Sequence, residues 1–376
     1  MTGSASFTPS RLTLARQRRG MTLVQLAGEV GLTPQSLSNA ECGRQDPSGS
    51  TLVKIAECLG FPIEFFSSPD LEELQDVQVS FRARSKTSAK AKAAVRSAAR
   101  IAVELRQWID KRFVTPTTDV PSIDANMSSE LAAEHVRARW GLDPVQSVPN
   151  CVHLLEANGI AVFSLPPEYR DVDAFSFWWR ETPFIMLSTT KSAERSRFDA
   201  AHELGHLVMH RNEDYNRDWR SAEREANQFA SAFLMPRSSV LKHISRPATT
   251  DRIIRGKTRW KVAAMALAYR LHELGALSEW TYRQVVIELG RLGYRSSEPD
   301  GLMRETSQFL AKVLGALRED RTSLAAIAKE LHVEADELRH LTFGLVVRSA
   351  GAEVPSTAGT SRPEVPRLRL VRGLAR

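Results

Sequence analysis

The sequence contains few cysteines and no long hydrophobic run, and each shortage excludes a class of protein. The three cysteines, Cys42, Cys58 and Cys151, include no C-x-x-C pair. An odd, low count argues against a disulfide framework and against a thiolate metal site. No run reaches the roughly 18 apolar residues of a transmembrane helix, and the first 20 residues lack the apolar segment of a signal peptide. We therefore expect a cytoplasmic protein that has no membrane partner.

Charge of both signs is present, with a modest basic excess. The 376 residues include 51 Lys and Arg and 44 Asp and Glu, which gives a formal net charge of +7. This excess suits a nucleic-acid partner but does not identify one by itself. The length suggests two or three domains, each large enough to bury its own core.

Composition and periodicity divide the chain into five parts. Residues 1–70 are typical of a bundle of short helices punctuated by glycines, and residues 71–129 form a basic helical connector and a linker. Residues 130–290 combine helices with short strands, two of them at AFSFWW and PFIMLS. Residues 291–349 are expected to be helical, with one helix starting at Arg304, and residues 350–376 to be disordered. The predicted fold class is mainly α with a small β-sheet (α+β).

The stretch FDAAHELGHLVMHR contains the motif HExxH. His202 and His206 are four residues apart, so on a helix both imidazoles project from one face and reach one metal ion. Glu203 points about 100° around that helix, where it can take a proton from metal-activated water. The alternative is a pair of core histidines satisfied by their neighbours. We favour a catalytic Zn²⁺ site, because unpaired histidines on an otherwise apolar helix are costly.

The third protein ligand of such a site is expected from the next helix, SAEREANQFASAFLMP. Glu223 and Asn227 share one helix face, so a carboxylate ligand and a second polar group one turn later can orient the metal and a histidine. We favour Glu223, with Glu225 as the alternative. His210 is also four residues beyond His206, and we expect it to cap the helix end or to pack in the wall of the site.

These two segments together resemble the ImmA/IrrE family of zinc metallopeptidases. The resemblance extends from PFIMLS through KTRWKVAAMALAYRLHELG and covers about residues 148–290. It implies a zincin-like domain that cuts repressor or regulator proteins, with zinc ligands His202, His206 and Glu223 and the general base Glu203. Tyr215, in the loop between the two helices, is a candidate for stabilising the oxyanion.

The N-terminal stretch TLVQLAGEVGLTPQSLSNAECGR has the pattern of a helix-turn-helix. Gly31 suits the turn, Thr33 is a good helix N-cap and Pro34 a good first helical residue. The outward side chains of the second helix are then placed to meet base edges in the major groove. The candidate DNA-contacting residues are Thr33, Gln35, Ser36, Asn39 and Arg44, and further phosphate contacts are expected from Arg11, Arg16, Arg18 and Arg19.

This segment resembles the Cro/CI-type (XRE) helix-turn-helix over about residues 12–66. One departure is Leu23, where many members carry a glutamine that supports a phosphate contact; Gln25 stands two positions later. The alternative is a small helical bundle for protein contact. The resemblance implies double-stranded DNA as a partner. Dimerisation is a hypothesis that follows from paired half-sites, and a monomeric mass in solution with full DNA affinity would contradict it.

A second segment, residues 323–345, has a similar helical rhythm but an acidic outward face. Glu334, Asp336 and Glu337 would repel phosphate, so we interpret it as structural or as a protein-contact surface.

Two classes of function follow from these patterns. The first is a DNA-binding regulator that carries a zinc endopeptidase with a regulatory protein as its substrate. The second is a transcription factor that uses the metallopeptidase-like domain only as a sensor or dimerisation module.

Overall fold

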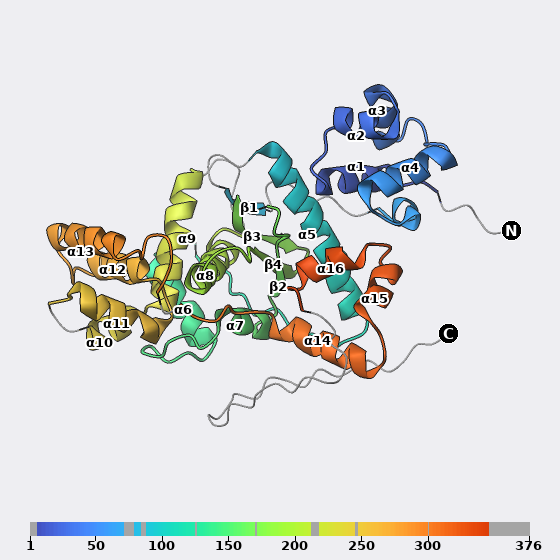
Figure 1. The fold of residues 1–376 in the computed structure, drawn as a ribbon. Helices are drawn as coiled ribbons and strands as arrows, with labels where there is room; N and C mark the ends of the chain where they lie inside the picture. The colour runs from blue at the N-terminus through green and yellow to red at the C-terminus, as the bar shows by residue number, and fades with distance from the viewer. Residues whose placement is uncertain are drawn as a thin grey trace.

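The structure is a computed structural model that describes residues 6–70, 88–124, 126–169, 171–211, 218–244, 247–299 and 301–345, together with the backbone of residues 79–83. Helices dominate and surround one small sheet, so the predicted α+β class is confirmed (Figure 1). The expected disordered tail, residues 350–376, lies outside the described residues. Among the described helices, none is long and apolar enough to cross a membrane.

The N-terminal bundle consists of five short helices. They are α1 (Pro9–Arg18), α2 (Leu23–Val30), α3 (Pro34–Glu41), α4 (Gly49–Leu59) and the 3-10 helix η1 (Ile63–Ser67). Thr22 and Gln25 form a capping box that starts α2, and the side chain of Thr33 accepts the Ser36 amide that starts α3. Gly31 takes the left-handed conformation, with φ 71°, that turns the chain between these two helices. Local sequence therefore sets the geometry of the turn.

Helix α5 (Ala89–Asp110) connects this bundle to the rest of the molecule. It packs against α1, and its apolar face belongs to the same hydrophobic cluster as the core of the bundle. The buried guanidinium of Arg11 donates to Glu104 of α5 at 3.0 Å and to the carbonyl of Pro69 at 2.9 Å. The bundle is thus fixed to α5 by apolar contacts and by an ion pair.

Four strands form a sheet in the order β1-β3-β4-β2. The strands are β1 (Val79–Ala83), β2 (Ala161–Ser164), β3 (Val172–Trp179) and β4 (Thr182–Leu187). β2 and β4 are parallel, whereas β3 runs antiparallel to both β4 and β1. Because side chains alternate along a strand, Phe175 and Phe177 face the cluster shared with α5, and Ala174 faces the second core beneath α8. The sheet therefore separates two cores.

The second core is covered by α6 to α13. These helices are α6 (Ser129–Arg139), α7 (Cys151–Ala157), α8 (Ala193–Met209), α9 (Trp219–Leu234), α10 (Arg237–His243), α11 (Thr250–Trp260), α12 (Ala264–Glu273) and α13 (Glu279–Arg291). Helix α8 lies against both the sheet and α9. A Cβ at Gly205 would stand 3.2 Å from Ala226 and 3.1 Å from Phe229, so the glycine lets α8 and α9 approach closely.

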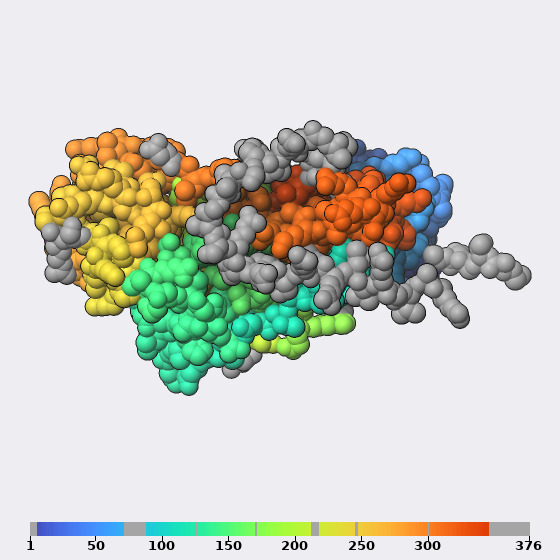
Figure 2. Space-filling view, turned by 90° about the horizontal axis from the view of Figure 1, so that it is seen from below, coloured from blue at the N-terminus to red at the C-terminus, as the bar shows by residue number. Residues whose placement is uncertain are grey.

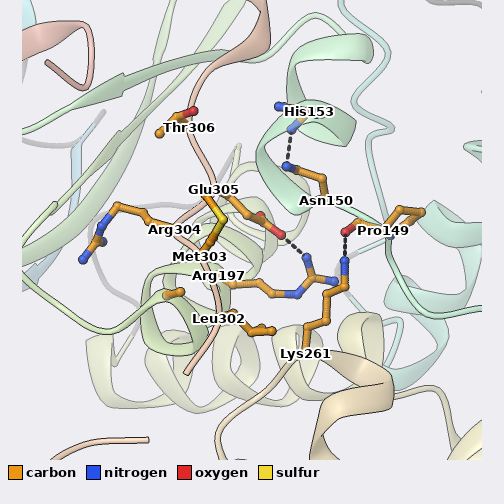
Figure 3. Close-up of a pocket in the computed structure, with 11 residues that line it drawn as sticks. Pro149, Asn150, His153, Arg197, Lys261, Leu302, Met303, Arg304, Glu305 and Thr306 are labelled. Carbon is orange, nitrogen blue, oxygen red and sulfur yellow. Dashed lines mark hydrogen bonds and ion pairs between the residues drawn. The ribbon is translucent and has the colours of Figure 1, made fainter. Parts of the chain in front are cut away.

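Residues 301–307 have no regular secondary structure, and this corrects the expected helix start at Arg304. Glu305 pairs with the buried Arg197 of α8 and accepts the amide of Cys151, beside a cavity of about 340 Å³ (Figure 3). The next helix, α14 (Gln308–Glu319), begins where Ser307 caps it. Glu156 accepts the Gln308 amide at 3.0 Å, and burial raises the pKa of this carboxyl to about 7. Because of these tertiary contacts, the helix starts only after residue 307.

The last two helices, α15 (Leu324–Glu330) and α16 (Ala335–Leu341), pack against the N-terminal bundle and α5. Figure 2 shows these C-terminal helices beside the bundle at one end of an elongated molecule, with α10 to α13 at the other end. The prediction that Glu337 faces outward is wrong, because its side chain is only 6% exposed. The contacts of Glu337 lie inside the same chain, which agrees with the interpretation of residues 323–345 as structural.

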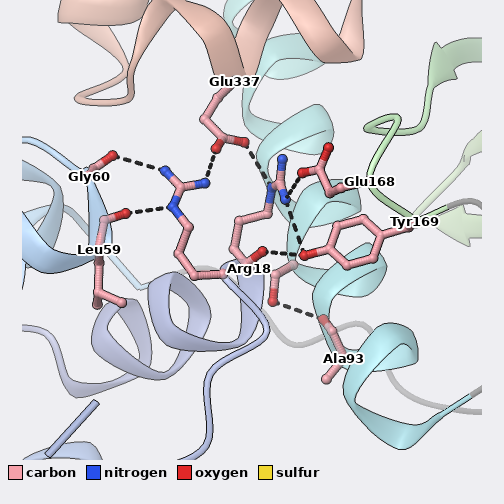
Figure 4. A network of polar contacts seen from close by, with 9 residues as sticks. Arg18, Leu59, Gly60, Ala93, Glu168, Tyr169 and Glu337 are labelled. Atoms are coloured by element: carbon pink, nitrogen blue, oxygen red, sulfur yellow. Dashed lines mark hydrogen bonds and ion pairs between the residues drawn. The ribbon is translucent and has the colours of Figure 1, made fainter. Parts of the chain in front are cut away.

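Glu337 pairs with two arginines of the N-terminal bundle (Figure 4). It accepts from Arg18 Nε at 2.8 Å and also pairs with Arg19. Glu168 pairs with Arg18 at 2.9 Å, and the Tyr169 hydroxyl donates to the Arg18 carbonyl at 2.6 Å. Although burial acts to lower the pKa of Arg18, the groups beside it, led by Glu337, raise that pKa, so the guanidinium stays charged. We call these five residues the arginine clamp.

Candidate functional site

Helices α8 and α9 bring two imidazoles and one carboxylate to a common point. His202 Nε2 and His206 Nε2 are 3.1 Å apart. Glu223 of α9 lies 3.5 Å from the first nitrogen and 3.3 Å from the second. The two histidine side chains are nearly inaccessible to solvent, whereas that of Glu223 is 22% exposed. Among the described residues, these three are the cluster with the spacing of metal ligands.

The three separations match what a zinc ion needs. A tetrahedral ion with bonds of about 2.0–2.1 Å places neighbouring ligand atoms about 3.3 Å apart. The separations of 3.1, 3.3 and 3.5 Å bracket that value. Two imidazoles and one carboxylate are also a donor set that zinc takes in hydrolytic sites, where a fourth position stays open. The residues present therefore fit a zinc ion.

The other ring nitrogen of each histidine is held by a neighbour. His202 Nδ1 lies 3.1 Å from Asn227 Oδ1, so it is the protonated nitrogen and leaves Nε2 as the ligand atom. His206 Nδ1 lies 2.9 Å from His210 Nδ1, and His210 Nε2 lies 3.2 Å from Glu225 Oε2. A chain of two hydrogen bonds thus leads from His206 to the carboxylate of Glu225. Both contacts orient the rings toward the convergence point.

Glu203 is fully buried beside the sheet. Its Oε2 accepts the Ser176 hydroxyl of β3 at 2.7 Å. Because β3 carries small residues at 174 and 176 on this face, α8 can lie close enough for that hydrogen bond. The HExxH motif alone does not predict a role for Ser176. The one hint in the sequence is that this residue is small and polar and lies between two phenylalanines, Phe175 and Phe177. Ser176 fixes the direction of the Glu203 carboxylate.

The structure brings together His202, His206 and Glu223, and it separates Glu225 from them. Glu225 contacts His210 instead, so the geometry favours Glu223 as the third ligand. His210 is the C-cap residue of α8, and its ring lies tilted beside that of His206 with a centroid distance of 5.0 Å. Tyr215 lies outside the described residues.

In the N-terminal bundle, the candidate base-contacting side chains lie on one exposed face of α3. Gln35 and Ser36 are exposed and Asn39 is half-buried. The Gln35 amide donates to Asn39 Oδ1 at 3.1 Å, which aligns the two side chains on that face. Thr33 is also exposed, but its hydroxyl is engaged in capping α3. Arg44 follows α3 and is exposed.

The four arginines of α1 and its C-cap all pair inside the chain, and burial of two of them corrects the expectation that those two hold phosphates. Arg11 and Arg18 are each 1% exposed, so their assignment to phosphate contacts is wrong. Arg16 forms a two-pronged pair with Glu41 of α3 at 2.6 and 2.8 Å. Arg19 donates to Glu337 and to the Leu59 carbonyl. Burial therefore removes Arg11 and Arg18 from any DNA-facing surface, whereas Arg16 and Arg19 stay partly exposed.

Comparison with known families agrees with this geometry. Residues 12–66 match a family model described as helix-turn-helix, and residues 155–272 match one described as the IrrE N-terminal-like domain, of a metallopeptidase family. The chain is a fusion of these two domains. The predicted fusion is thereby confirmed. The helix-turn-helix domain corresponds to α1 through η1, and the IrrE-like domain contains β2 to β4, α8 and α9. A comparison with curated proteins finds no match.

Proposed function

We propose that the chain is a DNA-binding transcriptional regulator whose IrrE-like domain is a zinc-dependent endopeptidase acting on a regulatory protein. The observation that carries the proposal is the convergence of His202, His206 and Glu223 within zinc-ligand distances. Glu203, which follows His202 in the motif and is buried against Ser176, would supply the general base that hydrolysis requires. A domain kept only as a sensor or for dimerisation would not need Glu203.

The chain's own residues suggest how hydrolysis would proceed. When bound, zinc would act as a Lewis acid that polarises the peptide carbonyl and acidifies water. Glu203 would accept the proton of the attacking water and pass it to the departing amine. Ser176 would hold that carboxylate in place, while Asn227 and His210 keep the ring nitrogens of the two histidines oriented.

Metal content tests the proposed site directly. Purified chain is expected to bind about one zinc ion, and Glu223→Ala is expected to lose it because only two protein ligands remain. Glu225→Ala is the contrasting variant: it removes the carboxylate that contacts His210 but none of the three ligands, so it should still bind zinc, with weaker affinity. The zinc-to-protein ratio, measured by elemental analysis after dialysis, checks this expectation. Zinc-free, well-folded wild-type protein would favour the non-enzymatic regulator.

The DNA-reading proposal rests on the exposed face of α3. Gln35→Ala with Asn39→Ala is expected to weaken binding to the selected operator about 10- to 100-fold, because a good side-chain pair to a base contributes about 1–3 kcal/mol. Binding to unrelated DNA should change little, since phosphate contacts dominate there. Titration of an operator selected from random duplexes, beside a scrambled duplex at the same salt concentration, measures the ratio. An unchanged ratio would show that α3 does not read bases through these residues.

A further inference from the structure

The proposed peptidase site lies directly beside β3. Ser176 of this strand holds Glu203, and Arg211, which follows α8, stacks over Trp178 of the same strand at 3.8 Å. On one side β3 pairs with β4. Without β1, the other side of β3 would be an edge of the sheet, and it is the edge nearer Glu203, because β2 forms the opposite edge. An exposed strand edge binds extended peptides through main-chain hydrogen bonds.

That edge of β3 is already covered by a segment of the same chain. Strand β1, residues 79–83, pairs with β3 in the antiparallel direction and stands at the edge of the sheet in Figure 1. Ser80 lies opposite Ser176, and Phe81 lies opposite Phe175. The paired segment is therefore in register with the residue that holds Glu203. Between residues 81 and 83 the register shifts, and Ala83 then lies opposite Val172.

Both ends of the segment that contains β1 are anchored in the fold. On the N-terminal side, Arg11 donates to the Pro69 carbonyl at 2.9 Å and Thr8 donates to the Ser68 carbonyl at 2.8 Å. On the C-terminal side, Ser88 caps α5. Because the tether between these anchors is short, the strand competes for the β3 edge at an effective concentration on the order of millimolar.

We propose that β1 is an internal competitor of the peptide substrate, seated on the edge of β3 at which that substrate binds. The proposal rests on the proposed endopeptidase function and assigns the regulation of its site. Extended substrate and β1 require the same backbone donors and acceptors of β3, so only one can pair at a time. Since β1 belongs to the connector between the two domains, the same connector that carries the DNA-reading bundle restrains the peptidase.

Opening the edge tests this proposal in the full-length chain. In an antiparallel pair, of two adjacent residues one directs its N–H to the partner strand. Ser80→Pro with Phe81→Pro therefore removes a pairing donor whichever residue supplies it. The probe is a labelled synthetic peptide of residues 77–85, VQVSFRARS. Binding is followed by fluorescence anisotropy in a Glu203→Gln background, which keeps the peptide intact.

The double-proline chain is expected to bind the peptide at least about tenfold more tightly than the chain with native β1, because the tethered competitor is gone. Ser80→Thr with Phe81→Tyr is the matched control and should behave like native β1, since both replacements favour a strand. Ser80→Gly with Phe81→Gly weakens the strand without removing a donor and serves as a second opened variant.

Equal affinity in the native and opened chains, or no binding of the peptide to either opened variant, would overturn the proposal. Cleavage of the zinc-loaded native chain between residues 79 and 83, seen by mass spectrometry, would also overturn it, because β1 would then be a substrate. The zinc content of the same preparations distinguishes failure of the competitor proposal from failure of the endopeptidase proposal. Protein without zinc would contradict the proposed endopeptidase function, but peptide binding to the native and opened chains could still be compared.

Discussion

Glu203→Gln is expected to lower peptide hydrolysis by about 1000-fold, because a positioned general base contributes about 10²- to 10⁴-fold. Glutamine has nearly the same shape and can still accept the Ser176 hydroxyl, so the packing between α8 and β3 is retained. It cannot accept a proton from water. The metal ligands are untouched, and the zinc content should stay at the wild-type level.

Hydrolysis of unfolded casein, measured beside zinc content, checks this prediction. Ser176→Ala is the control that keeps the carboxylate but removes the group that orients it, and its activity should fall between those of wild type and Glu203→Gln. Wild-type turnover in Glu203→Gln protein would rule out this residue as the base. Turnover lost together with zinc would instead assign Glu203 a role in holding the metal centre.

Glu337→Ala is expected to destabilise the docking of the helix-turn-helix domain by about 3 kcal/mol, because it leaves a buried guanidinium without its main partner. Arg18 is 1% exposed and Glu337 is 6% exposed at the side chain, so water cannot replace the lost contact. Glu168 still pairs with Arg18, which keeps the effect near the lower end for broken buried ion pairs.

Urea denaturation that resolves the first unfolding transition measures this effect. The matched control is Glu334→Ala, since Glu334 is the exposed N-cap residue of the same helix and makes no side-chain cap hydrogen bond. A transition equally stable in both variants would contradict the assignment of the arginine clamp as the main polar contact between the domain and α16.

Local patterns predicted the parts of the structure that depend on neighbouring residues. The spacing of His202 and His206, the N-cap Thr33 and the alternating strands all act over a few residues, so period and residue type were sufficient. The pairing of Glu223 with the two histidines was predictable because it needs only two adjacent helices. The family matches at residues 12–66 and 155–272 agree with these predictions from local sequence.

Contacts between distant segments could not be read in the same way. Arg18 looks like a phosphate ligand in the sequence because nothing near it is acidic, and its partner lies 319 positions away at Glu337. The connector is expected to be mostly helical after a short extended start, but the pairing of that start with β3 depends on an edge that exists only after the sheet has formed. The hydrogen bond from Ser176 to Glu203 likewise could not be predicted, because it exists only when α8 packs on β3.

The internal use of the α1 arginines changes how the chain should respond to salt. Each phosphate neutralised by a protein cation releases counterions and adds about 0.9 to the slope of log K against log salt concentration for duplex DNA. Arg11 and Arg18 are already neutralised by Glu104 and Glu337, so they release nothing when DNA arrives. A count of arginines in the first 20 residues would therefore overestimate this slope. The binding of DNA by this chain should tolerate salt better than its basic N-terminal sequence suggests.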